Sequence, residues 1–186
     1  LYRGKVMKGI VFTELFDMVE GLFGVDMIDD VLDDCELESG GAYTTVGTYD
    51  HNELLQIVGA LSKHTDLPVK DLLHKYGYHL FFRFHEIMPV FFEKPKSTFE
   101  FLESVHDHIH VEVKKLYPDA ALPHFETERN DDDILTMVYK SCCPFADFAE
   151  GLIHGCVDFY KENIEIQSEN QNMAEEYSRI FTLIKQ

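Results

Sequence analysis

The chain has 186 residues, 45% of them hydrophobic and 27% charged, which favours a single globular domain with a substantial core. Lys and Arg number 16 and Asp and Glu 34, a net charge of −18. This charge argues against nucleic acid and membrane surfaces as partners and favours a protein partner with a basic patch. No apolar stretch reaches transmembrane length and residues 1–6 lack a signal-peptide core, so we expect a cytoplasmic protein.

Helical periodicity dominates the first half of the sequence. Asp50 is placed to cap the helix that follows it, and Ser97 to cap the last long helix. The pattern predicts helices over 8–23, 25–35, 51–64, 66–87 and 97–117, a turn over 38–41, an extended link over 42–49 and a loop between Pro89 and Pro95.

The pattern changes after the linker from Pro118 to Pro123. Alternating residues predict strands over 124–128, 134–140, 164–168 and 178–185, with a helix over 144–161 between the two pairs. The predicted fold class is α+β, a helical N-terminal part followed by a four-stranded antiparallel sheet with one helix. We interpret Met7 as the initiator methionine and therefore expect residues 1–6 to be a non-native or disordered start. Residues 7–186 are expected to form one domain.

The first candidate site lies in the last predicted helix before the strands. Its apolar stripe comprises Leu102, Val105, Ile109, Val113 and Leu116. His106 and His110 lie on the same stripe, whereas His108 points away. An imidazole in an apolar stripe is either a core residue bonded to the backbone or a metal ligand, and the spacing alone leaves both open.

The four cysteines, at positions 35, 142, 143 and 156, show no Cys-x-x-Cys spacing. Adjacent cysteines rarely bridge each other, so we expect reduced thiols and no disulfide framework. An enzyme built on Cys142 or Cys143 is a weak hypothesis, because no Cys/His signature is present and strand cysteines are usually buried and inert.

The order of elements, with His110 seven residues before Tyr117-Pro118, resembles the H-NOX family of haem-based nitric oxide and oxygen sensors. That family includes the haem domain of soluble guanylate cyclase and stand-alone bacterial sensors. The resemblance starts at Met7, covers essentially the whole chain and includes Gly77 and the segment 151–155. It implies haem b as the cofactor, His110 as the iron ligand and Pro123 as the residue that presses on the porphyrin. It also implies a distal helical subdomain over about 7–70 and a proximal one over about 71–186.

The family also carries a Tyr-x-Ser-x-Arg motif that binds the haem propionates. Tyr139 and Ser141 match this motif, whereas Cys143 stands in the place of the arginine. A thiol cannot replace a bidentate carboxylate clamp, and charge-assisted bonds contribute about 1.5–3 kcal/mol each, so we expect weaker haem binding or a substitute base. The resemblance further places apolar residues against the haem, namely Val11, Phe84 and Leu152.

The resemblance implies that the residues on the distal side of the haem determine which gas binds. Oxygen-binding members carry a tyrosine where this chain has Phe148, and two supporting polar positions match Leu15 and Leu80. Bound oxygen is polar and is stabilised by a hydrogen-bond donor. An apolar wall therefore implies binding of nitric oxide, and of carbon monoxide, with little oxygen affinity. Tyr78 or His79 would change this expectation if either pointed inward.

The resemblance implies a sensor with no catalysis of its own. Nitric oxide weakens the iron bond to His110, the helix bearing His110 is freed, and the subdomains shift. A separate partner reads this change, and in bacterial relatives that partner is a histidine kinase or a cyclic-di-GMP enzyme.

Two other interpretations remain open from the sequence. His106 and His110 could ligate zinc or non-haem iron, although Asp107 stands where the usual helical motif has Glu. A haem-free domain of the same fold could hold a hydrophobic ligand instead. Visible absorption separates these interpretations, because haem absorbs intensely and the alternatives do not.

Overall fold

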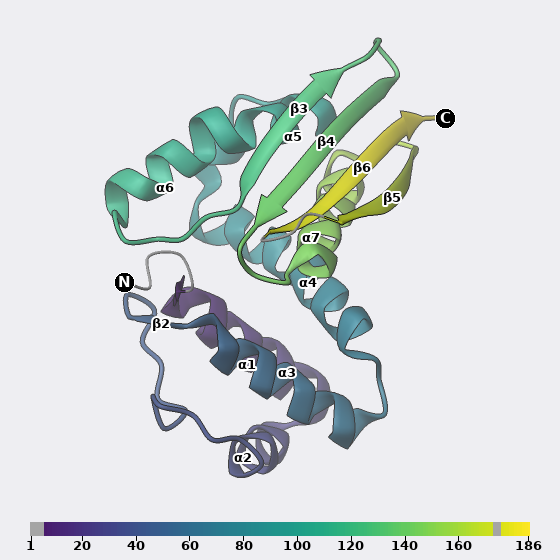
Figure 1. Cartoon of the computed structure of the whole chain (residues 1–186). Helices are drawn as coiled ribbons and strands as arrows, with labels where there is room; N and C mark the ends of the chain where they lie inside the picture. The colour runs from purple at the N-terminus through teal and green to yellow at the C-terminus, as the bar shows by residue number, and fades with distance from the viewer. Residues whose placement is uncertain (1–5, 173–175) are drawn as a thin grey trace.

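The structure is a computed structural model that describes residues 6–172 and 176–186, and its elements follow the predicted order (Figure 1). The N-terminal elements are β1 (Val6–Lys8), α1 (Gly9–Phe23), α2 (Val25–Asp33), β2 (Thr48–Asp50), α3 (His51–Thr65) and α4 (Val69–Ile87). They are followed by a 3-10 turn (Pro89–Phe92), α5 (Thr98–Ser104), a π-helical turn (Val105–Ile109) and α6 (His110–Leu116). The C-terminal elements are β3 (His124–Arg129), β4 (Ile134–Ser141), α7 (Ala146–Tyr160), β5 (Ile164–Asn172) and β6 (Tyr177–Lys185).

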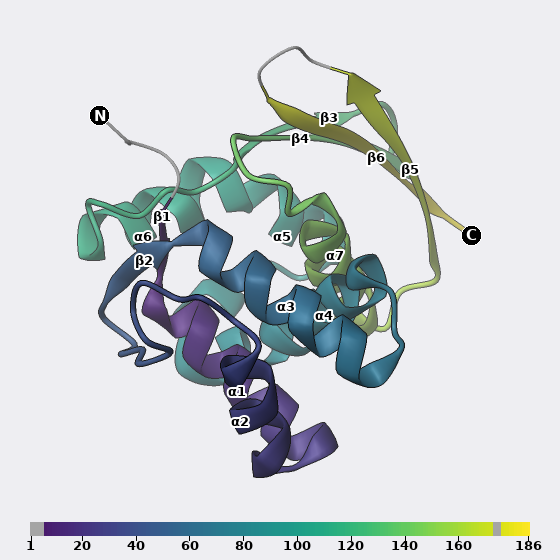
Figure 2. The ribbon, with the colours of Figure 1, turned by 60° about the horizontal axis from the view of Figure 1, so that its bottom comes forward.

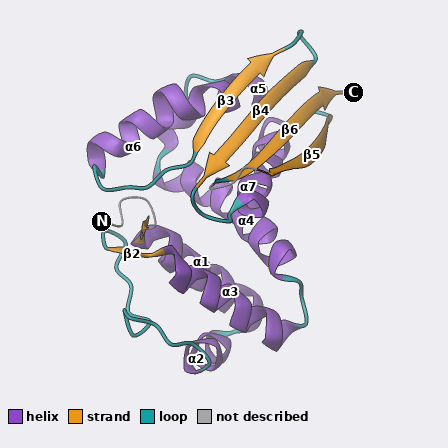
Figure 3. Ribbon diagram, in the orientation of Figure 1, coloured by secondary structure: helices purple, strands orange, loops and turns teal. Residues whose placement is uncertain are grey.

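The four C-terminal strands form an antiparallel sheet in the order β3-β4-β6-β5, which confirms the predicted α+β class. Figure 3 shows the sheet along one side of the molecule, with helices packed on one of its faces. The register places Tyr139 of β4 between Phe125 of β3 and Arg179 of β6. In Figure 2, α7 lies between this sheet and α4, while α1 and α2 lie farther from the sheet.

The predicted capping residues begin their helices as expected. The Asp50 side chain accepts a hydrogen bond from the Asn52 amide at 2.7 Å, and Ser97 Oγ accepts one from the Glu100 amide at 3.3 Å. Gly24, with a φ of 89°, separates α1 from α2 because a residue with a Cβ rarely adopts that backbone conformation.

Two hydrophobic clusters form the core. The first lies among α1 to α4 and includes Phe12, Leu54 and Leu73. The second lies where the sheet meets α5 and α7, and it includes Leu135 and Met137, alternate residues of β4. Several phenylalanine rings pack against one another within the second cluster. The ring centroid of Phe81 lies 5.4 Å from those of both Phe92 and Phe101. The abundance of phenylalanine is therefore explained largely by core packing.

Helices α4 and α7 join the two clusters through an unusually close contact. A Cβ added at Gly77 would lie 2.0 Å from the Phe148 carbonyl oxygen, and one at Gly151 would lie 2.0 Å from the His74 carbonyl oxygen. The His74 Nε2 and His154 Nδ1 atoms lie 2.8 Å apart across the same contact. Only glycine at these positions allows the two helix backbones to approach so closely.

The structure corrects several details of the sequence prediction. The helix predicted over 97–117 is interrupted by the π-helical turn, and Leu116, assigned to its apolar stripe, is 66% exposed because the stripe loses its cover beyond Val113. The strands β1 and β2 pair antiparallel. Thr48 and Tyr49 of β2 lie in the predicted extended link, whereas β1 was missed because its three residues are too few for a visible alternation. Residues 1–5 of the expected disordered start lie outside the described residues, and Val6 pairs with Asp50. No helix in the described part of the chain has the length and apolarity to cross a membrane.

We expect Gly77→Ala to lower the free energy of unfolding by about 1–3 kcal/mol, because the added methyl group meets backbone that cannot move aside. Chemical denaturation monitored by circular dichroism measures this change. Gly59→Ala in α3 is the matched control: no atom lies within 4 Å of its added Cβ, so helix propensity should raise the stability by about 1 kcal/mol. Equal effects at both positions would contradict the close α4–α7 contact.

Candidate functional site

His110 is one of three described residues with a buried side-chain polar atom that has no partner, the others being His79 and Thr98. It begins α6 directly after the π-helical turn, a local geometry that is frequent at functional sites. Its Nδ1 atom is buried and has no hydrogen-bond partner among the residues that the structure describes. Burial lowers the pKa of His110 to about 4; His106 adds to this effect and the Pro123 carbonyl opposes it. The imidazole is therefore neutral at pH 7, the form that ligates a metal.

His106 differs from His110 although their ring centroids lie 6.2 Å apart. The Phe125 amide donates a hydrogen bond to His106 Nδ1 at 3.4 Å, and the His106 ring lies 4.2 Å from that of His124. These contacts tie the π-helical turn to β3. The structure thus gives His106 a partner within the protein and leaves a His110 nitrogen available.

A conventional metal site requires several protein ligands, and the described residues do not supply them near His110. Within residues 6–172 and 176–186, no three His, Cys, Asp or Glu side chains gather in a way that could hold an ion. Zinc sites in proteins use three or four such ligands. A group that needs a single protein ligand, as haem does, fits the observed histidine better.

Several apolar side chains on three helices are only partly buried from solvent. Val11 of α1, Phe84 of α4, and Phe148 and Leu152 of α7 are only partly buried, and all four pack against the first cluster. Leu152 also packs against the second cluster, as does Ile109 beside His110. A flat apolar group placed there would remove the remaining exposed surface from water, which is favourable. Leu15 and Leu80 are already fully covered, with exposed fractions of 1% and 0%.

Tyr139 and Ser141 converge on the main chain of Cys143. The buried Tyr139 hydroxyl donates a hydrogen bond to the Cys143 carbonyl at 3.2 Å, and the Cys143 amide donates one to Ser141 Oγ at 3.1 Å. Burial raises the pKa of Tyr139 to about 12, so its hydroxyl remains a donor at neutral pH. The Cys143 side chain is buried within the first cluster, and a thiol there adds no positive charge to this group.

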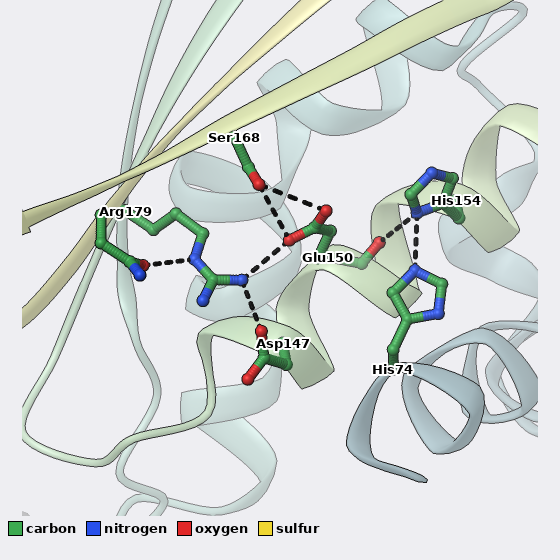
Figure 4. A network of polar contacts seen from close by, with 7 residues as sticks. His74, Asp147, Glu150, His154, Ser168 and Arg179 are labelled. Atoms are coloured by element: carbon green, nitrogen blue, oxygen red, sulfur yellow. Dashed lines mark hydrogen bonds and ion pairs between the residues drawn. The ribbon is translucent and has the colours of Figure 1, made fainter. Parts of the chain in front are cut away.

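Arg179 is the cation nearest to Tyr139 in the sheet register, and sequence reasoning missed it. Its Nη1 atom lies 2.7 Å from Asp147 and 2.8 Å from Glu150, both on α7, and its Nε atom donates to Asn170 (Figure 4). An arginine directly before the apolar pair Ile180–Phe181 in a predicted strand was the available signal. Because two carboxylates already neutralise Arg179, it does not replace the arginine that Cys143 displaces.

Two polar residues of α4 that could have faced the distal wall are directed elsewhere. The exposed Tyr78 hydroxyl donates to Asp158 on α7 at 2.8 Å. His79 lines a surface pocket of about 450 Å³ together with Asp17 and Met18 of α1. Burial lowers the pKa of His79, so its ring is neutral at pH 7.

Comparison with known proteins places this geometry in a family. The family model described as Haem-NO-binding matches residues 8–168. The Fe(II) unliganded H-NOX protein of K. algicida has 40% sequence identity and a TM-score of 0.89, with 97% of each chain covered. The chain belongs to the H-NOX family. This membership confirms the predicted family, fold class and haem cofactor, and makes the chain a domain of a family of haem-based gas sensors.

Two further structures show how widely the fold of this H-NOX domain is shared. The IWP-051-bound H-NOX of Shewanella woodyi, in its Fe(II)CO state, has 41% identity and a TM-score of 0.82, with 97% of this chain and 95% of that chain covered. A mutant form of the T. Tengcongensis H-NOX shares the fold at 23% identity, with a TM-score of 0.87 and 97% and 98% of the two chains covered. Comparison with curated protein sequences gives no significant match.

We expect Cys143→Arg to slow the loss of haem about ten- to a hundredfold, because the family resemblance implies that an arginine at this position binds a propionate, and such a charge-assisted bond contributes about 1.5–3 kcal/mol. Transfer of haem to apomyoglobin, followed by visible absorption, measures the rate. Cys142→Arg, one residue away at an exposed position, is the matched control and should leave the rate unchanged. Equal rates for Cys143→Arg and the parent protein would contradict the proposed position of the propionates.

Proposed function

We propose that this H-NOX domain binds haem b through His110 and senses nitric oxide at the ferrous iron. The single observation that carries the proposal is the neutral imidazole of His110, whose Nδ1 atom is buried and has no partner among the described residues. Bound ferrous haem would supply the atom that binds nitric oxide or carbon monoxide and would weaken its bond to His110 when nitric oxide binds. The protein's own residues hold that cofactor, select the gas and transmit the change.

The partly buried apolar residues would cover the faces of the haem, and Tyr139 and Ser141 would bind its propionates. Val11, Phe84, Phe148 and Leu152 all retain exposed surface that haem would cover. The Pro123 carbonyl opposes the lowering of the pKa of His110, so Pro123 lies near the proposed ligand. This position supports a role for Pro123 as the residue that contacts the porphyrin next to the iron ligand.

We infer that the distal side favours nitric oxide over oxygen because the three side chains matched to it, those of Phe148, Leu15 and Leu80, are apolar. Phe148 is apolar, and Leu15 and Leu80 are closed within the core. The ring of Tyr76 lies 5.2 Å from that of Phe148, but the Tyr76 hydroxyl donates to the Val11 carbonyl and is not available to a gas. Bound oxygen would therefore lack the polar contact that stabilises it.

The helix that carries His110 is suited to transmit a change at the iron. Neither the π-helical turn nor α6 contains a fully buried residue, so few contacts would hold this segment once the bond from His110 is lost. Movement of α6 would then be a population shift between two conformations. We propose that a separate histidine kinase or cyclic-di-GMP enzyme in the cytoplasm reads this shift, and that the domain itself catalyses no reaction.

One observation favours a second candidate, a module of the same fold that binds another hydrophobic ligand. Cys143 leaves the proposed propionate site without its arginine, and Arg179, the nearest cation in the sheet register, is already paired with Asp147 and Glu150. Such a module would remain colourless when it is produced with added haem.

We expect His110→Gly to remove the protein ligand of the iron and the response to nitric oxide, and we expect added imidazole to restore the ferrous haem spectrum. Absorption spectra of the purified variant with and without imidazole measure this. His106→Gly is the matched control and should keep the parent spectrum, because His106 Nδ1 already accepts from the protein backbone. The opposite result, with the spectrum lost only in His106→Gly, would exchange the roles of the two histidines.

We expect Phe148→Tyr to introduce measurable oxygen binding, because a distal hydroxyl can donate a hydrogen bond to bound oxygen and improve its affinity about five- to tenfold or more. The ferrous absorption spectrum in air, compared with that under argon, measures the effect. Tyr76→Phe tests the specificity of the result, since the Tyr76 hydroxyl is already engaged by Val11 and its removal should not alter gas binding. Identical spectra of Phe148→Tyr in air and argon would mean that residue 148 does not face the gas.

A further inference from the structure

Two adjacent thiols lie in the connection between β4 and α7. The Sγ atoms of Cys142 and Cys143 are 3.5 Å apart, in contact but beyond the length of about 2.05 Å of a disulfide bond. Cys142 is exposed to solvent, whereas Cys143 is buried. The remaining cysteines, Cys35 and Cys156, lie on other elements of the fold. The pair thus combines one thiol that a reagent can reach with a second thiol already at contact distance.

The same pair is tied to the residues proposed to bind the haem propionates. The Cys143 carbonyl accepts hydrogen bonds from the Tyr139 hydroxyl at 3.2 Å and from the Phe145 amide at 2.9 Å. The Cys143 amide donates to Ser141 Oγ at 3.1 Å. The peptide unit between Cys142 and Cys143 contains the Cys143 amide, so its rotation directly changes the hydrogen bond to Ser141 Oγ. The Cys143 carbonyl, which accepts from Tyr139, belongs to the next peptide unit and follows the backbone of Cys143.

We propose that Cys142 and Cys143 form a reversible vicinal disulfide when a low-molecular-weight disulfide oxidises them, and that this bridge loosens the haem site. The Cys142 thiolate attacks one sulfur of the small disulfide, forms a mixed disulfide and releases one small thiolate. The Cys143 thiolate then attacks the Cys142 sulfur, closes the bridge and releases the second. The protein thiols lose two electrons and two protons in total, and the small disulfide is reduced to two thiols.

The geometry makes such a bridge a switch and not a permanent cross-link. A disulfide between neighbouring residues closes a small ring that cannot satisfy the usual Cα separation of about 4.4–6.8 Å without distorting the intervening peptide. Strained or exposed disulfides have high reduction potentials and are the labile ones. The distortion falls first on the Cys143 amide, which donates to Ser141 Oγ, and a change in the Cys143 backbone then also turns the carbonyl that accepts from Tyr139. The effect on haem rests on the proposed function, whereas the thiol chemistry does not.

The thiol chemistry is tested by incubating the whole protein, as isolated, with glutathione buffers of increasing oxidised fraction. After blocking of remaining thiols, digestion with trypsin and a glutamyl endopeptidase releases residues 141–150, which contain Cys142 and Cys143 but not Cys156. We expect this peptide to lose two hydrogen atoms in mass, and dithiothreitol to reverse the loss. Cys143→Ser should stop at the glutathione adduct on Cys142, and Cys156→Ser should behave like the parent. A parent protein that also stops at the adduct would overturn the proposed bridge.

The consequence for the site is tested by haem transfer to apomyoglobin from the oxidised and the reduced protein. We expect transfer about five- to tenfold faster from the oxidised protein, the effect of losing one hydrogen bond, and no such difference in Cys142→Ser. An unchanged rate with the bridge present would overturn the link to the haem site. Failure of the protein to bind haem would contradict the proposed function, and the mass result for peptide 141–150 would still decide whether the bridge forms.

Discussion

The central constraint in this molecule is an imidazole that the fold keeps neutral and, at one nitrogen, without a partner among the described residues. Leaving a buried polar atom unpaired costs about 1–3 kcal/mol, so His110 is a local weakness of the fold. A bond from this same nitrogen to a metal would remove that cost. His106, one helical turn earlier, accepts a hydrogen bond from Phe125 and has no such cost. This difference supports the choice of His110 over His106 as the proposed ligand.

The rest of the fold separates a rigid frame from a loosely held segment. Gly77 and Gly151 allow α4 and α7 to touch, the His74–His154 contact bridges them, and Arg179 fastens the sheet to α7 (Figure 4). The π-helical turn and α6, in contrast, contain no fully buried residue. In the proposed mechanism, loss of the iron bond to His110 would move the π-helical turn and α6 and leave the packing of α4 and α7 unchanged.

Periodicity and capping were sufficient to predict the long helices, the four strands of the sheet and the α+β class. Features set by tertiary packing were not predictable in this way. The π-helical turn before His110 depends on contacts with β3, such as the His106–Phe125 bond, which no local pattern reveals. The β1–β2 pair joins segments about forty residues apart through three residues each. The ion pairs of Arg179 depend on how α7 lies on the sheet, so the sequence left that residue unnoticed.

For the site, the sequence provided the candidate residues and the structure provided their relations. The spacing of His110 to Tyr117 and Pro118 pointed to one histidine, but its pKa of about 4 and its unpaired nitrogen arise only in the folded chain. The convergence of Tyr139 and Ser141 on the Cys143 main chain likewise depends on the turn after β4. The positions of Val11, Phe84 and Leu152 against the haem remain predictions.

The most direct test is the ratio of haem to protein, with the ferrous absorption spectrum, after production with added haem. The account predicts one haem per chain and a spectrum that changes when nitric oxide is added. A correctly folded protein that takes up no haem under these conditions would contradict it.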